Sequence, residues 1–151
     1  MNNLIKSSNP NTEKLELLQL IEEKQRRQKL NPLNYFNCYS PIRHEKQIEF
    51  HEAEQPMRVL LWGNRVGKTE AGGMEAAYYL TDTHPHRKVG PQIEGWISSP
   101  SFDLQLDGTQ KKLERYLGDQ IEHVDYLRGN IWKNVRIKKT GSLATFKSYE
   151  Q

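Results

Sequence analysis

The sequence predicts an α/β fold in which a mainly parallel sheet is flanked by helices and preceded by an N-terminal helical arm. Three observations support this prediction. The apolar run at residues 58–62 resembles a buried parallel strand. A glycine-rich turn ending in Gly67-Lys68-Thr69 follows, and residues 70–80 then have the composition of a helix. Strand, turn and helix in this order are typical of a P-loop NTPase core.

The turn has the chemistry of a triphosphate-binding loop. A polyphosphate needs inward-pointing backbone N–H groups, an ammonium at its outer phosphates and a hydroxyl on the magnesium ion, and Gly67, Lys68 and Thr69 supply these in order. Trp62 holds the position of the first glycine of the usual spacing, which leaves the start of the loop open. A surface turn that contains a lysine is the alternative. The expected ligand-binding residues are Gly63, Asn64, Arg65, Val66, Gly67, Lys68 and Thr69.

Length and charge limit the classes of function. A chain of 151 residues is long enough for one domain with a real core. The net charge of +3, from 22 basic and 19 acidic residues, does not indicate a general polyanion-binding surface, so contact with DNA would have to be local. The single cysteine, Cys38, excludes an internal disulfide. No secretory signal or membrane-spanning run is visible, and we expect a soluble intracellular protein.

The five histidines are scattered and have no cysteine or carboxylate partners at metal-ligand spacing. We therefore expect solvated loop histidines rather than a metal site. They are His44, His51, His84, His86 and His123.

Two regions are predicted: residues 1–40, a helical arm with an aromatic connector, and residues 41–151, a partial P-loop domain. Leucines at helical spacing, with acidic residues early and basic residues late, predict an amphipathic helix from about Pro10 to Lys29. Asn9 is its expected cap. The basic end of this helix contacts nucleic acid or a partner, or it is a solvated face.

Residues 42–51 predict a short helix that contains Gln47. A glutamine amide can read the edge of an adenine ring, because it offers one acceptor and two donors. A glutamine on an exposed helix is otherwise simply solvated.

The rest of the chain predicts further core elements. Residues 95–100 form a short strand with Ser98, Ser99 and Ser101 at its carboxyl end, where ligand-facing groups of α/β sheets gather. Helical packing through Leu113 then ends at Gly118, with Lys111, Lys112 and Arg115 on the opposite face. Residues 131–138 and 142–148 form a β-hairpin whose basic side chains face DNA or solvent.

Four stretches together resemble the N-terminal ATPase part of the large terminase subunit of tailed bacteriophages, the motor that drives DNA into the capsid. The stretches are residues 43–51, 63–72, 95–103 and 141–151. The phosphate loop alone is shared by many families, whereas the ordered set is more specific.

The resemblance implies a site for ATP and Mg²⁺. Gln47 belongs to its adenine-recognising element, Lys68 and the Thr69 hydroxyl hold the outer phosphates and Mg²⁺, and Arg65 senses or stabilises the γ-phosphate. Lys68 and Arg65 are thus the expected catalytic residues. The implied partners are double-stranded viral DNA, a small terminase subunit, the portal and further copies in a ring, in the cytoplasm of the bacterial host and without a membrane.

Two elements of that family have no counterpart in the 151 residues: the acidic strand that orders Mg²⁺ and supplies the catalytic carboxylate, and the nuclease domain. The expectation is an incomplete core, an N-terminal fragment that by itself hardly hydrolyses ATP. Two alternatives stay open: a piece of another P-loop helicase or translocase, and a non-catalytic remnant that only binds a partner.

Overall fold

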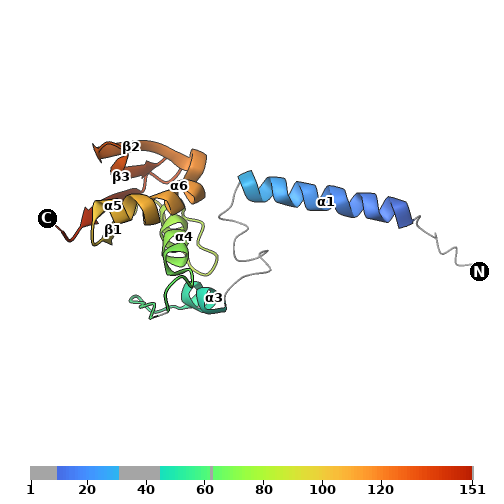
Figure 1. Ribbon diagram of the computed structural model, residues 1–151, viewed down its shortest axis with the longest axis horizontal. Coiled ribbons are helices and arrows are strands. Elements are labelled where there is room, and N and C mark those ends of the chain that lie inside the picture. Colours follow the sequence, from blue (N-terminus) through green and yellow to red (C-terminus); the bar gives the residue numbers. More distant parts are fainter. Residues whose placement is uncertain (1–9, 31–44, 62, 151) are drawn as a thin grey trace, which may run out of the picture.

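The computed structural model describes residues 10–30, 45–61 and 63–150. The predicted arm helix is confirmed as α1 (Pro10–Leu30), which lies apart from the sheet and the other helices in Figure 1. Its described leucines are exposed, from 49% at Leu18 to 67% at Leu20. The expected cap Asn9, the aromatic connector with Cys38, and Trp62 lie outside the described residues.

A four-stranded sheet forms the centre of the fold. Its strands are β1 (Glu94–Ser99), β2 (Ile121–Arg128), β3 (Ile131–Ile137) and β4 (Leu143–Ser148), in the order β1-β4-β3-β2. β1 runs parallel to β4, whereas β2 with β3 and β3 with β4 are antiparallel. This sheet is mixed, where the sequence predicts a mainly parallel one. The reason is that short turns join β2 to β3 and β3 to β4, and such turns produce antiparallel neighbours.

The predicted strand at 95–100 and the predicted hairpin are confirmed, but β2 was not foreseen. Its side chains are mostly exposed, so it lacks the regular apolar alternation of a half-buried strand. The Gly129-Asn130 pair between β2 and β3 is a hairpin signal that sequence reasoning missed.

Helices cover one face of the sheet. The predicted helix after the glycine-rich turn is confirmed as α4 (Lys68–Thr81). A second helical run contains α5 (Phe102–Gln105), the π-helical turn η1 (Leu106–Gln110) and α6 (Lys111–Leu117). It ends at Gly118, as predicted, where φ is +47°, and a 3-10 turn, η2 (Gly118–Gln120), leads into β2.

The core lies between these helices and the sheet. Met74 and Ala77 of α4 and Leu113 of α6 are fully buried, and they share one apolar cluster with β3 and β4. Trp132 and Phe146 meet edge to face in that cluster, with ring centroids 5.7 Å apart. The cluster therefore ties α4 to the sheet.

The short helix predicted at 42–51 is α3 (Glu45–Glu52), whose expected first residues lie outside the described part of the chain. In Figure 1, α3 lies beside α4 and away from β2 and β3. In the ranges that the structure describes, no helix is both long enough and apolar enough to cross a membrane.

The strand predicted at residues 58–62 is wrong for the four residues described. Residues 58–61 form no strand, and Val59 and Leu61 are 71% and 90% exposed. Arg58 holds this segment against helices instead, since its guanidinium donates to the Phe50 carbonyl at 2.7 Å and to Glu75 of α4 at 2.5 Å. An apolar run becomes a strand only when a neighbouring strand pairs with its backbone.

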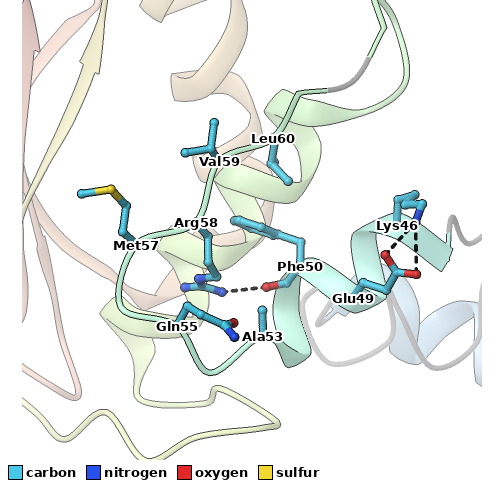
Figure 2. Close-up of a pocket in the computed structure, with 9 residues that line it drawn as sticks. All are labelled: Lys46, Glu49, Phe50, Ala53, Gln55, Met57, Arg58, Val59 and Leu60. Atoms are coloured by element: carbon cyan, nitrogen blue, oxygen red, sulfur yellow. Dashed lines mark hydrogen bonds and ion pairs between the residues drawn. The ribbon is translucent and has the colours of Figure 1, made fainter.

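Figure 2 shows the hollow between α3 and this segment, of about 250 Å³. Phe50 and Arg58 face each other in it, with the guanidinium carbon 4.7 Å from the ring centroid. No residue from 63 to 69 lines this hollow, so it is separate from the candidate phosphate site.

Candidate functional site

The glycine-rich turn leads directly into α4. Gly67 precedes the helix with φ of +84°, and Arg65 also has a left-handed backbone, with φ of +60°. Gly67, the N-cap residue of α4, has no side chain with which to cap the helix. The first N–H groups of a helix have no partner within it, so this end of α4 attracts an anion.

The Lys68 side chain spans the glycine-rich turn. Its ammonium donates to the Gly63 carbonyl at 2.7 Å and therefore lies over the loop. Thr69 follows in the first turn of α4 with an exposed side chain. Lys68 and Thr69 both line the hollow at the loop.

Gln47 lies against the loop, although it is 20 residues away in sequence. Its side-chain nitrogen donates to the Gly67 carbonyl at 3.2 Å, and the residue is only 7% exposed. The alternative of a solvated glutamine on an exposed helix is therefore wrong. The amide supports the loop backbone in this structure, and its contact with adenine stays a prediction.

A hollow of about 430 Å³ opens at the loop. Three basic side chains line it, and Glu70 is the one acidic residue among those that form its described wall. A surface of this charge suits a phosphorylated ligand. The lining residues are Asn64, Arg65, Gly67, Lys68, Thr69, Glu70 and Lys112.

A second hollow, of about 420 Å³, shares Lys68 and Thr69 with the first and extends along α4 to β1. Ser98 lines it, as expected for the carboxyl end of this strand. Ser99 and Ser101 have local structural roles instead. The Ser99 hydroxyl donates to the Ser101 carbonyl at 2.6 Å, and the Ser101 hydroxyl caps α5 by accepting from the Leu104 N–H at 3.3 Å.

Glu70 joins α4 to α6 beside the loop. Its carboxylate accepts from Lys112 and Arg115, each at 2.6 Å, and from the Tyr116 hydroxyl. Burial raises the pKa of Glu70, but the hydrogen bonds from Lys112 and Tyr116 and the charge of Arg115 outweigh burial and lower it. Glu70 is therefore a charged group. The sequence shows Lys112 only as a basic residue on the polar face of a helix.

A buried polar cluster joins α3 to α4. Glu75 accepts from Arg58, its second oxygen lies 2.6 Å from His51 Nδ1, and His84 Nε2 lies 3.2 Å from both oxygens. His51 is fully buried and His84 is 8% exposed. The expectation of solvated histidines is wrong for these two residues, because each needs a partner from a distant element that spacing does not reveal. His44 lies outside the described residues, and His86 and His123 are exposed.

The tautomer of His84 follows from its contacts. Its Nδ1 accepts from the His86 N–H at 3.1 Å, so its Nε2 carries the proton that is donated to Glu75. Burial lowers the pKa of His84, and the Glu75 carboxylate offsets this only in part. Burial raises the pKa of Glu75, but the hydrogen bonds from His51 and Arg58 outweigh this effect, so the pKa lies below its ordinary value. This cluster holds α3, and with it Gln47, against α4.

Within the part of the chain that the structure describes, no three His, Cys, Asp or Glu side chains are grouped to hold a metal ion. A magnesium ion bound with a nucleotide needs no such group, because phosphate oxygens and waters supply most of its ligands. The exposed Thr69 hydroxyl at the loop fits this kind of site.

Comparisons with known proteins find a partial match to a phage protein. No protein-family model matches the chain, and no solved structure matches it. Over 81 residues, 52% of this chain, it is 37% identical to a protein named "Terminase, large subunit" from Salmonella phage P22. The matched region spans only 15% of that relative's length. Part of this chain is therefore similar to a phage large terminase subunit.

Proposed function

We propose that residues 63–69 bind the phosphates of ATP, and that the chain supplies the nucleotide-binding part of a DNA-packaging ATPase of the large terminase kind. The observation that carries this proposal is the Gly67-Lys68-Thr69 turn, where a helix with glycine at its N-cap begins at a hollow with three basic side chains. The partial similarity to the phage P22 protein supports the packaging setting.

Each residue of the loop has a role in this proposal. The first N–H groups of α4 donate to phosphate oxygens, and Lys68 exchanges the Gly63 carbonyl for an outer phosphate. Arg65, exposed at the same hollow, stabilises the charge that develops on the γ-phosphate. Lys68 and Arg65 are the proposed catalytic residues.

Magnesium supplies charge neutralisation at the phosphates, and the Thr69 hydroxyl is the ligand that this chain offers it. The Gln47 amide supports the loop through Gly67, and in this proposal it also contacts the base. The remaining loop residues, Gly63, Asn64 and Val66, complete the backbone around the phosphates.

The work of the whole machine is part of the same proposal. We propose that the chain belongs to a motor that couples ATP hydrolysis to the movement of double-stranded viral DNA into the capsid, as a ring of subunits with a small terminase subunit and the portal. The matched region spans 15% of that relative's length, so the activity and the partners of the whole machine are proposals.

Binding of a fluorescent ATP analogue with Mg²⁺ tests the proposal. We expect Lys68→Ala to weaken binding about ten- to hundredfold, because a charge-assisted hydrogen bond contributes about 1.5–3 kcal/mol. Lys133→Ala is the control, since Lys133 is exposed on β3 and does not line the hollow. Equal binding by both variants contradicts the site, and no binding by the wild-type chain favours the partner-binding remnant.

A further inference from the structure

We propose that Lys112 of α6 is a third cationic residue of the polyphosphate site, beside Lys68 and Arg65, and that Glu70 holds it until a phosphate displaces it. This inference rests on the proposed function and names a residue that the loop motif does not contain. Lys112 lies 43 residues beyond Thr69 in the chain, yet it lines the same hollow as Arg65 and Lys68.

The position of Lys112 follows from close packing of α6 on α4. A β-carbon added at Gly73 would lie 3.1 Å from the β-carbon of Lys112, a tighter approach than most side chains allow. Glycine at position 73 therefore lets the stem of Lys112 lie directly on α4. The ammonium then reaches Glu70, one turn earlier on α4, at 2.6 Å.

Glu70 can release Lys112 without becoming an unpaired buried charge. Its carboxylate keeps Arg115 at 2.6 Å and the hydroxyl of Tyr116 as partners. The Lys112 side chain is 35% exposed, so its ammonium borders the hollow rather than the core. A phosphate with more negative charge than a carboxylate competes well for this ammonium.

Lys111 provides a matched comparison on the same helix. It pairs with Asp107 at 2.7 Å, is 62% exposed and does not line the hollow. Two neighbouring lysines of equal charge therefore differ in whether they line the hollow at the loop. Each added contact to the outer phosphates favours a triphosphate over a monophosphate.

The competing interpretation is that Lys112 only neutralises Glu70. A double-mutant cycle distinguishes phosphate binding by Lys112 from mere neutralisation of Glu70. The cycle uses Lys112→Met, Glu70→Gln and the double variant, with Lys111→Met as control. Methionine keeps the apolar stem that packs on Gly73. Lys112→Gln is a second variant, and circular dichroism confirms that each one is folded.

The measurement is binding of Mg-ATP and AMP at two salt concentrations. We expect Lys112→Met to weaken ATP binding about tenfold, to change AMP binding less, and to reduce the salt dependence. Lys111→Met leaves binding unchanged. Glu70→Gln strengthens binding because it frees Lys112, and Lys112→Met weakens binding in that background too.

Failure of the inference is distinct from failure of the proposed function. If the wild-type chain does not bind ATP, or Lys68→Ala binds normally, both are overturned. If Lys68→Ala loses binding while Lys112→Met behaves like Lys111→Met, only the role of Lys112 is overturned. If the double variant binds as Glu70→Gln does, Lys112 acts only by neutralising Glu70, and the inference is also overturned.

Discussion

Gln47 and Gly67 are in direct contact: the glutamine side-chain nitrogen donates to the glycine carbonyl at 3.2 Å, and a β-carbon on residue 67 would lie 2.4 Å from that nitrogen. The Gln47 side chain therefore joins α3 to the loop through its contact with Gly67. Position 67 requires glycine twice over, for its left-handed backbone and for this contact.

Gly67→Ala tests that relationship. We expect a loss of about 1–2 kcal/mol from the left-handed backbone and a further loss from the contact with Gln47. Urea denaturation measures the total loss of stability. Adding Gln47→Ala to the Gly67→Ala chain should recover the loss from the contact with Gln47 but not the loss from the left-handed backbone. Gly63→Ala is the control, because a β-carbon there meets nothing within 4 Å. A Gly67→Ala chain as stable as Gly63→Ala would contradict the described loop.

Glu75→Gln tests the buried cluster between α3 and α4. It removes the carboxylate partner of Arg58, whose side chain is only 13% exposed, and we expect a loss of about 3 kcal/mol in the free energy of unfolding. Glu49→Gln, which breaks a solvent-exposed pair with Lys46, should cost less than about 0.5 kcal/mol. Equal losses would mean that the cluster does not join the two helices.

The same cluster predicts a fall in stability on acidification. The folded-state pKa of His84 lies below its unfolded value, so unfolding takes up a proton and stability falls as pH drops below about 6.5. Glu75 has a lowered pKa as well, so its contribution is present above about pH 4.3 and is lost at still lower pH.

Denaturation midpoints at about pH 7.5 and 5.5 measure the first step. We expect a smaller difference between the two midpoints in His84→Gln than in the wild-type chain. His123→Gln, on the exposed face of β2, should keep the wild-type difference. A His84→Gln chain with an unchanged pH dependence would assign the effect to another group.

Two neighbouring glycines of α4 should respond differently to alanine. Gly72→Ala should raise stability by about 0.5–1 kcal/mol, because its β-carbon meets nothing within 4 Å and alanine favours a helix. Gly73→Ala should be less stable than Gly72→Ala, since its β-carbon presses on Lys112. Thermal unfolding of both variants measures the difference, and equal stability would show that α6 does not pack so closely.

The sequence by itself determined the local elements. α4, β1 and the β3–β4 hairpin follow from periodicity and turn residues within a few positions, and the loop motif identifies Lys68 and Thr69 as neighbours at a helix start. Such features depend on residues close in the chain. Residues 58–61 are apolar enough for a strand but form none, because a strand also requires a neighbouring strand. Local composition does not reveal whether such a neighbour exists.

Only the tertiary structure decided which distant residues meet. It placed Gln47 on Gly67, gathered His51, Arg58 and His84 around Glu75, and put Lys112 beside Glu70. The physical reason is that these contacts depend on how α3, α4 and α6 pack, and packing is set by the whole core rather than by any one segment.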